Sequence, residues 1–331
     1  MDGMTSAAFR SLCFEYGADG ASTEMIGAVG LARAKGRRRP VMEALLLRRP
    51  EEGRLAAQII GRDVEAMAAA AAKIEALGRF DLVEINMGCP ARCVVGGGSG
   101  AALLRDPERA GEILRAVCGR VSLPVRLKLR LGWDADHISA PEIARIAQDA
   151  GCAEIILHGR NRSQGYAGEV DLEAMRRVRA AISIPLYANG AVSCARDAEA
   201  FSKAVGAQGV CIGRAALKQP WIFEDIRAIE RGDAPRERDA RARVMLLLRF
   251  AGRLCAQKPE RFAVQELRKY SLWYLDGLRG AREAFEHIKA AETLEDFRRI
   301  HLEYLNALER SGDVCVHPEL RADASLNTVA R

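Results

Sequence analysis

Short apolar segments alternate with longer amphipathic or alanine-rich segments along the first 230 or so residues of the chain. The apolar segments are bounded by glycine, proline or acidic residues, which is typical of buried strands. The predicted strands are Gly20–Met25, Ala56–Gly61, Leu82–Asn86, Pro124–Arg130, Glu154–His158, Pro185–Ala188 and Gly209–Gly213. The helices predicted between them are Asp63–Leu77, Pro107–Val121, Ala140–Ala150, Leu172–Ala181 and Cys194–Val205. This alternation predicts repeated β-α units and a parallel sheet.

Seven strands separated by helices are one fewer than a closed eight-stranded β/α barrel contains. We therefore predict an α/β fold, a (β/α)8 TIM barrel whose first strand is truncated in this sequence. Either the start of the sequence is assigned downstream of the first barrel strand, or the barrel tolerates a shortened first strand. An open barrel would leave unpaired backbone groups along two strand edges.

From about residue 234 the pattern changes to helical periods without a convincing strand. The predicted helices are Asp239–Gln257, Arg261–Leu275, Ala281–Ala290 and Thr293–Glu309. They predict a small helical bundle that follows the barrel. The expected organisation is a barrel domain over 1–233, a helical domain over 234–320 and a polar, disordered tail over 321–331.

Composition narrows the class of protein. The chain has 331 residues, of which 49% are hydrophobic and 28% charged, as in ordinary soluble proteins. Its apolar runs are far shorter than the roughly 20 residues of a membrane helix, and no signal peptide opens it. Nine scattered cysteines, an odd number, do not form a disulfide framework, so we expect a reducing cytoplasm. We also expect a monomer. The net charge of +6 suits RNA, but many enzymes of small molecules carry as much.

The segment Leu82–Pro90 brings an asparagine and a cysteine to the end of a predicted strand. Two segments follow it: a predicted glycine-rich loop, Gly96-Gly97-Gly98-Ser99, and then Gly100-Ala101-Ala102-Leu103-Leu104. Asn86 can hydrogen-bond a planar heterocycle, and Cys89 can give or take a proton. The same residues also fit a strand, a turn and a buried cysteine. Cys93 is interpreted as a loop or packing residue, and no second Cys or His pair completes a metal site, so no metal is expected.

Other predicted strands also end in polar residues, and in a β/α barrel ligands bind at these carboxyl ends. Lys128 and Arg130 alternate onto one side of their strand, and charge inside a barrel needs an anionic partner. The remaining strand ends carry Gln58, His158-Gly159-Arg160, Asn189-Gly190 and Gly213-Arg214. Each residue alone has a structural interpretation, such as a satisfied core histidine at His158 or an internal salt bridge at Lys128.

Taken together, these strand ends resemble the tRNA-dihydrouridine synthase family, in particular its bacterial B-type branch, over about residues 1–310. The family reads Asn-x-Gly-Cys-Pro followed by Gly-Ala-x-Leu-Leu at the positions of Asn86–Pro90 and Gly100–Leu104. The opening Met1-Asp2-Gly3-Met4-Thr5 matches the end of the family's first strand. The chain departs from the B-type pattern in its glycine-rich loop and at Asn161, where threonine is usual.

The resemblance implies an enzyme that reduces specific tRNA uridines, with bound FMN and with NADPH (or NADH) as electron donor. It implies that FMN is held by Met1, Asp2, Gln58, Lys128, His158, Asn189, Gly190, Ala191, Gly213 and Arg214. Cys89 would protonate C5 of the uracil, and Asn86 and Arg160 would hold the base. An ordinary cysteine, with a pKa of about 8.5, is mostly protonated at neutral pH. The helical domain would bind tRNA. Its candidate residues are Arg236, Arg238, Arg241, Arg249, Arg253, Arg268, Lys269, Arg298 and Arg299. The same region also carries many carboxylates, so each of these residues also fits a solvated surface of mixed charge.

Two other functions remain open from the sequence. One is an FMN-dependent barrel oxidoreductase of a free pyrimidine or other small metabolite, similar to dihydroorotate dehydrogenases. The other is a non-catalytic RNA-binding helper. Assays with tRNA and with free uridine separate the first from the resemblance, and a flavin spectrum would argue against the second.

Overall fold

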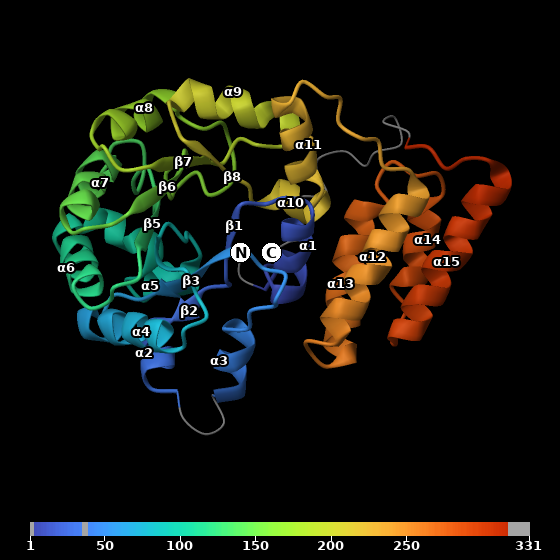
Figure 1. The fold of residues 1–331 in the computed structure, drawn as a ribbon, viewed down its shortest axis with the longest axis horizontal. Helices are drawn as coiled ribbons and strands as arrows, with labels where there is room; N and C mark the ends of the chain where they lie inside the picture. Colours follow the sequence, from blue (N-terminus) through green and yellow to red (C-terminus); the bar gives the residue numbers. More distant parts are fainter. Residues whose placement is uncertain (1–2, 35–38, 317–331) are drawn as a thin grey trace. The chain divides into compact units, whose positions relative to one another are not determined.

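The structure, a computed structural model, describes residues 3–34 and 39–316. The chain forms two compact units (Figure 1). The first comprises Met1–Ala215 and Ile222–Arg231, and the second comprises Ala216–Trp221 and Gly232–Arg331. The predicted tail over 321–331 lies outside the described residues.

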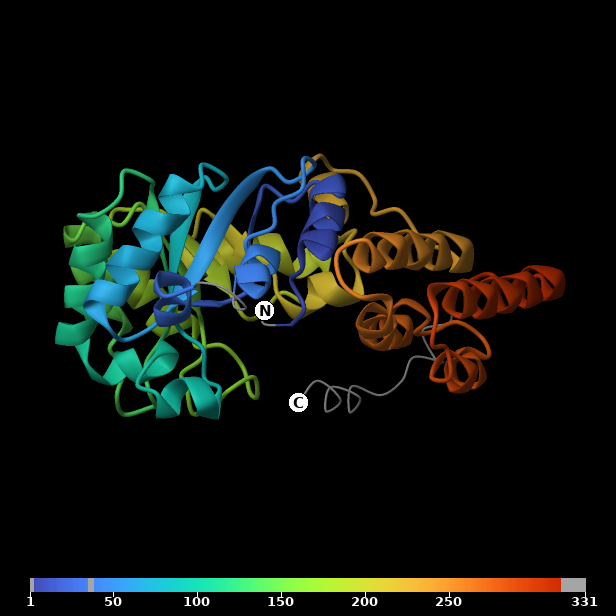
Figure 2. The ribbon, with the colours of Figure 1, turned by 90° about the horizontal axis from the view of Figure 1, so that it is seen from below.

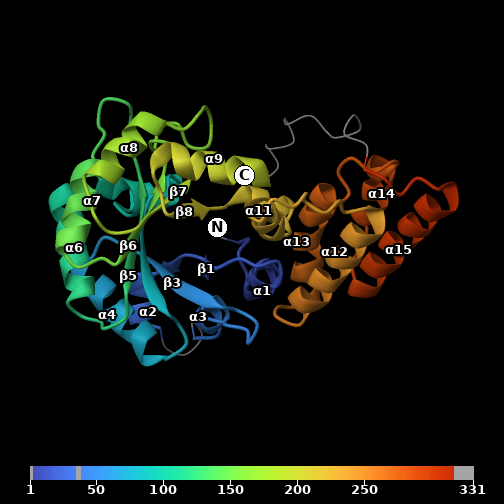
Figure 3. The same cartoon turned by 45° about the horizontal axis from the view of Figure 1, so that its top comes forward.

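The first unit is built on a parallel sheet that curves inside a layer of helices (Figure 3). Its strands are β1 (Gly20–Ser22), β2 (Ile26–Gly27), β3 (Arg54–Ile60), β4 (Leu82–Met87), β5 (Val125–Arg130), β6 (Glu154–His158), β7 (Leu186–Asn189) and β8 (Gly209–Cys211). Their order is β1-β3-β4-β5-β6-β7-β8, with β2 also paired to β3. This is the predicted TIM-barrel architecture. In the part of the chain that the structure describes, no strand precedes β1 and β8 does not pair with β1.

The predicted strand Gly20–Met25 is wrong as a single element. β1 pairs with the start of β3 and β2 with its end. Between them the hydroxyl of Thr23 accepts the backbone N–H of Gln58 at 2.9 Å. A side chain therefore takes the place of the backbone ladder, and both short strands occupy one strand position.

Helices connect the strands on the outside of the sheet. They are α1 (Ala7–Glu15), α2 (Ala28–Ala32), α3 (Arg39–Leu45), α4 (Val64–Ala76), α5 (Arg92–Gly96), the 3-10 helix η2 (Gly100–Arg105), α6 (Pro107–Cys118), α7 (Ala140–Asp149), α8 (Leu172–Ala180), α9 (Ala195–Val205), α10 (Arg214–Lys218) and α11 (Ile222–Glu230). The five predicted helices are present, and the carboxylates of Asp63, Asp106 and Asp171 cap three of them. The loop prediction for Gly96 is wrong, because this residue ends α5.

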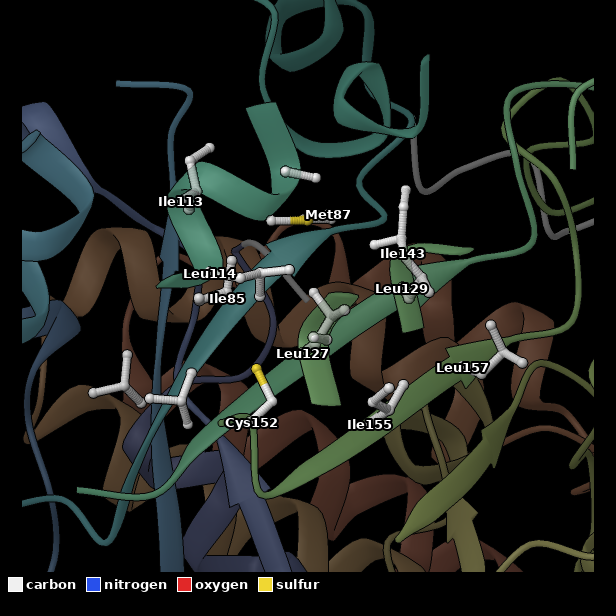
Figure 4. Packing of buried hydrophobic residues seen from close by; sticks show 14 of the residues in the cluster. Ile85, Met87, Ile113, Leu114, Leu127, Leu129, Ile143, Cys152, Ile155 and Leu157 are labelled. Carbon is white, nitrogen blue, oxygen red and sulfur yellow. The ribbon is translucent and has the colours of Figure 1, made fainter. Parts of the chain in front are cut away.

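The hydrophobic core of this unit lies between the sheet and the helices rather than inside the barrel. Alternate residues of β4, β5 and β6 point outward and pack on α6 and α7 (Figure 4). The residues labelled in that view are Ile85, Met87, Ile113, Leu114, Leu127, Leu129, Ile143, Cys152, Ile155 and Leu157. The other residues of the same strands therefore face the barrel interior, and many of these are polar.

A buried ion network occupies part of that interior. Arg126 Nε donates to Glu84 at 2.6 Å, and its Nη1 donates to Glu154 at 3.1 Å. Gln58 also donates to Glu84, and Arg54 pairs with Glu154 at 3.1 Å. Burial by itself would raise the pKa of the Glu84 carboxyl, but Arg126, Gln58 and Lys128 hold that pKa below its ordinary value. The two carboxylates here are thus balanced by two guanidinium groups.

The second unit is helical, as predicted (Figure 2). Its long helices are α12 (Ala240–Cys255), α13 (Glu260–Tyr274), α14 (Ala281–Ile288) and α15 (Leu294–Ser311). Phe250 of α12 packs edge-on against Tyr270 of α13, with ring centres 4.8 Å apart. The side chains of Thr293 and Asp296 form a capping box that begins α15. Among the helices of the described residues, none combines the length and apolar character needed to span a membrane.

We predict that Arg126→Met destabilises the protein by about 3–5 kcal/mol, because it leaves buried carboxylates without their main cation. Arg54→Met is the matched control, since Arg54 also pairs with Glu154 but its side chain is 45% exposed. We expect the control to cost about 0–1 kcal/mol. Urea unfolding followed by circular dichroism measures both, and equal losses in the two variants would contradict the assignment.

Candidate functional site at the carboxyl ends of the strands

The turn after β4 holds Cys89 in a defined position. The side-chain oxygen of Asn86 accepts the backbone N–H groups of Gly88 at 2.9 Å and Cys89 at 3.0 Å. The carbonyl of Cys89 accepts the N–H of Ala101 at 3.0 Å. Gly100 lies against this turn with φ +60°, and a Cβ there would come within 2.9 Å of the Cys89 carbonyl. The Gly-Ala segment thus fixes the backbone of the half-buried cysteine.

A polar chain crosses the interior from β3 to β4. The side-chain nitrogen of Asn86 donates to Gln58 Oε1 at 2.9 Å, while Gln58 donates to Glu84. Both residues are almost completely buried. In this arrangement Asn86 positions Cys89 through its oxygen, which leaves one N–H of its amide for a ligand.

Lys128 lies inside the barrel beside β7. Its ammonium group donates to Asn189 Oδ1 at 3.0 Å, and Asn189 in turn donates to the carbonyl of Cys211 at 2.7 Å. Burial lowers the pKa of Lys128, and the positive charge of Arg130 lowers it further, against the opposing effect of Glu84. One hydrogen bond to a neutral amide leaves donors of this ammonium group available.

His158 is neutral and packs between cations. Arg160 Nη1 lies 3.3 Å from His158 Nε2, and because a guanidinium group only donates, that ring nitrogen must be the acceptor. Burial, followed by the positive charges of Lys128, Arg130 and Arg160, lowers the pKa of His158 far below its ordinary value. Gly190, with φ +121°, lies against the ring, and a Cβ there would come within 2.8 Å of His158 Cδ2.

Arg130 ties two strand-end loops together. Its Nε donates to the carbonyl of Gly88 at 2.8 Å, and its Nη1 donates to the carbonyls of Asn161 at 3.0 Å and Gly165 at 2.6 Å. Its guanidinium group lies 5.3 Å from the ring centre of Tyr166, and that of Arg214 lies 5.0 Å from the same centre. The turn that carries Cys89 is thereby joined to the loop that carries Tyr166.

The strand ends hold an excess of positive charge. Lys128, Arg130, Arg160 and Arg214 have no carboxylate as an ion-pair partner within the described residues. Arg160 instead donates to backbone carbonyls of Gly168 and Gly190. Uncompensated cations inside a protein favour an anionic ligand. These cations, together with amide groups and a neutral imidazole, fit a planar heterocycle that carries a phosphate.

Most of the predicted site residues come together in this region. The residues at the strand ends of this one sheet are Gln58, Asn86, Cys89, Lys128, His158, Arg160, Asn189, Gly190, Gly213 and Arg214. Ala191 follows β7, and its side chain packs on the hydrophobic core. Met1 and Asp2 lie outside the described residues. Cys93 is exposed on α5, so its interpretation as a loop or packing residue is wrong.

Sequence reasoning assigned no role to Glu84, Arg126 or Tyr166. Glu84 and Arg126 could have been recognised, because each is a charged residue at an alternate position of an apolar strand. Such a charge must face a polar interior. Tyr166 had no local signal, since it lies in an irregular loop and meets Arg130 and Arg214 only in the folded chain.

The arginines predicted to bind tRNA have different surroundings in the helical unit. Arg241 pairs with Glu309 at 2.8 Å, and Arg299 pairs with Glu303 at 3.2 Å. The surface between α14 and α15 is lined by more carboxylates than cations. The other exposed candidates are Arg236, Arg249, Lys269 and Arg298.

Comparisons with known proteins point to one family. The family model described as "Dihydrouridine synthase (Dus)" matches residues 1–309. The chain is 39% identical over 280 residues to a probable tRNA-dihydrouridine synthase of Rhizobium leguminosarum bv. phaseoli. This alignment covers 83% of each protein. It is 36% identical over 300 residues to tRNA-dihydrouridine synthase B of Pseudomonas putida, covering 88% of this chain and 86% of the relative. With the corresponding protein of Vibrio cholerae the identity is 35%, covering 93% and 92%.

The neutral state of His158 predicts a pH dependence of stability. In the unfolded chain a histidine gains a proton below about pH 6.5, whereas folded His158 does not. The unfolded state then binds one proton more, so the free energy of unfolding decreases as the pH falls from about 6.5. We expect His158→Gln to reduce this slope by up to about 1.4 kcal/mol per pH unit, measured by urea unfolding of the ligand-free protein.

His137 provides the control for this experiment, because its side chain is 72% exposed. His137→Gln should keep most of the wild-type slope between about pH 5 and 6.5. A His158→Gln variant whose slope equals that of the wild type would mean that His158 is protonated in the folded protein.

Proposed function

The chain belongs to the dihydrouridine synthase family, and on that premise we propose that it reduces the C5–C6 double bond of specific uridines in tRNA, using FMN and NADPH. The observation that carries this proposal is the position of Cys89, fixed by Asn86 at the edge of a strand-end cluster of unpaired cations. The family match spans both units of the chain, which favours a substrate that needs the helical unit as well as the barrel.

FMN fits the donor set at the strand ends. Lys128, Asn189 and Gln58 offer an ammonium group and amides to the polar edge of a ring, and Arg214 offers a guanidinium group to a phosphate. Neutral His158 and the backbone of Gly190 provide a packed surface beside them. When bound there, FMN supplies a hydride for C6 of the uracil after its own reduction by NADPH.

The residues of this chain complete the reduction by handling the proton and the developing charge. Hydride addition at C6 moves an electron pair toward C5 and O4 of the base. The Cys89 thiol would donate its proton to C5, which forms the second new C–H bond and leaves a thiolate. Lys128 and Arg160 would stabilise the negative charge that develops before the proton arrives. Solvent then returns a proton to Cys89.

A uridine stacked inside folded tRNA cannot reach these groups, so it must be turned out, at a cost of a few kcal/mol. Contacts with the RNA backbone must offset that cost. Lys269 and Arg298 are exposed candidates in the helical unit, and neither forms an ion pair with a carboxylate of the described residues. We assign this unit to tRNA binding.

The direct test is reduction of tRNA from cells that lack dihydrouridine, with NADPH and the purified flavin-loaded protein. Mass spectrometry of the digested tRNA should show dihydrouridine, and free uridine should remain unreduced. Reduction of a free pyrimidine instead would identify a metabolite oxidoreductase. A protein that binds tRNA but no flavin would be a non-catalytic helper.

We predict that Cys89→Ala keeps bound flavin and its reduction by NADPH, because no proposed flavin contact is lost. Dihydrouridine formation should fall by about 10²–10⁴-fold, the usual contribution of a positioned acid. Cys93→Ala is the control, since Cys93 is an exposed cysteine on the following helix. Near-normal tRNA reduction by the Cys89 variant would rule out this residue as the proton donor.

The cofactor assignment gives a separate prediction. Arg214→Ala should weaken FMN binding by about 1.5–3 kcal/mol, the scale of one charge-assisted hydrogen bond. Lys128→Met should weaken it as well, because the ring loses a cation at its polar edge. Equilibrium dialysis or flavin fluorescence measures the Kd. Unchanged flavin affinity in both variants would place the cofactor elsewhere.

A further inference from the structure

A second cationic feature lies on the strand-end loops, separate from the proposed flavin and uracil contacts. The guanidinium carbons of Arg105 and Arg162 lie 4.8 Å and 4.5 Å from the ring centre of Trp133. Arg105 ends η2 after β4, Trp133 follows β5 and Arg162 follows β6. Three consecutive loops on the carboxyl side of the sheet thus meet at one indole ring, and we name these three residues the rim cluster.

Backbone hydrogen bonds hold the rim cluster together. The N–H of Arg162 donates to the carbonyl of Gly132 at 2.9 Å, and the N–H of Ser163 donates to the carbonyl of Trp133 at 3.0 Å. The preceding residue, Asn161, accepts a hydrogen bond from Arg130 at 3.0 Å. The cluster is therefore connected to the loop that Arg130 joins to the Cys89 turn.

The acids next in sequence to Arg105 and Trp133 do not form ion pairs with the rim cluster. Asp106 accepts the N–H of Arg109 as a helix cap, and Asp134 accepts His137 Nδ1 at 2.7 Å. No carboxylate forms an ion pair with Arg105 or Arg162 in the described ranges. The Nε atom of Arg162 is buried without a hydrogen-bond partner among those residues.

We infer that the rim cluster binds backbone phosphates of the RNA that the proposed function requires. Stacking on an indole fixes the plane of each guanidinium group, and a fixed plane suits paired hydrogen bonds from the terminal Nη groups to phosphate oxygens. Two fixed cations on adjacent loops suit successive charges of a polynucleotide better than the single charge of a small metabolite. The barrel itself, and not only the helical unit, then holds the RNA beside the strand ends.

The test compares tRNA binding by four flavin-loaded proteins across a range of salt concentrations. They are the wild type, R105A/R162A, R105K/R162K and R145A. Arg145 is an exposed arginine on α7 that is not part of the rim cluster, and it serves as the control for loss of surface charge. Fluorescence anisotropy with tRNA that lacks dihydrouridine gives the affinity and the slope of log K against log salt.

We expect R105A/R162A to bind tRNA roughly tenfold more weakly at moderate salt and to lose about one unit of slope for each arginine removed. R105K/R162K should keep most of the slope, because it keeps both charges. Flavin content, melting temperature and flavin reduction by NADPH without tRNA should match the wild type in all variants, which separates a lost contact from a damaged fold.

Binding and slope of R105A/R162A equal to those of R145A would overturn the inference and leave the proposed function standing. Slower flavin reduction by NADPH with unchanged tRNA binding would also overturn it, and would assign the rim cluster to the dinucleotide. Failure of the wild-type protein to bind tRNA at any salt concentration would overturn the proposed function and this inference together.

Discussion

The ion network around Arg126 determines where charge remains unbalanced inside the barrel. Arg126 contacts Glu84 and Glu154, and Arg54 shares the second of these carboxylates. Because the described acids of the interior are engaged there, none is left for Lys128, which lies two residues further along β5. The parallel register places Lys128 beside Asn86, so the uncompensated cation lies next to the cysteine turn. Arg126 is thus neutralised by carboxylates, whereas Lys128 at the strand ends is not. This difference favours an anionic ligand at the strand ends.

Positioning of the candidate acid depends on groups that would not themselves react. The side chain of Asn86 accepts the backbone N–H of Cys89, and Gly100 allows the segment after the turn to pack closely against Cys89. Arg130 joins the turn to the loop that carries Tyr166. The hydrogen bonds of Asn86 and Arg130 in this arrangement use backbone atoms as partners. The position of the thiol is therefore set by the backbone of several loops, which is the arrangement that a rigid barrel provides for strand-end chemistry.

The two units contribute different properties to the proposed activity. The barrel provides an interior with an excess of positive charge at the strand ends, while the helical unit adds exposed cations and a surface on which arginines pair with nearby carboxylates. The rim cluster changes this division, because it assigns part of the RNA contact to the barrel loops around Trp133. Contacts with the RNA backbone close to the strand ends would then help to offset the cost of turning a base out of its stack.

The amino-acid sequence by itself determined the strands from β3 to β8 with the long helices that join them, the change to helices after residue 234, and the positions of the strand-end residues. These features depend on local periodicity and on parallel strands whose carboxyl ends share one edge, so they can be recognised without coordinates. The tertiary structure decided how Thr23 interrupts the first strand position and which acids neutralise Arg126. It also brought Arg105 and Arg162 to one indole ring. Such contacts join residues that are far apart in the chain, and no local pattern records which partner a charged or aromatic side chain will meet.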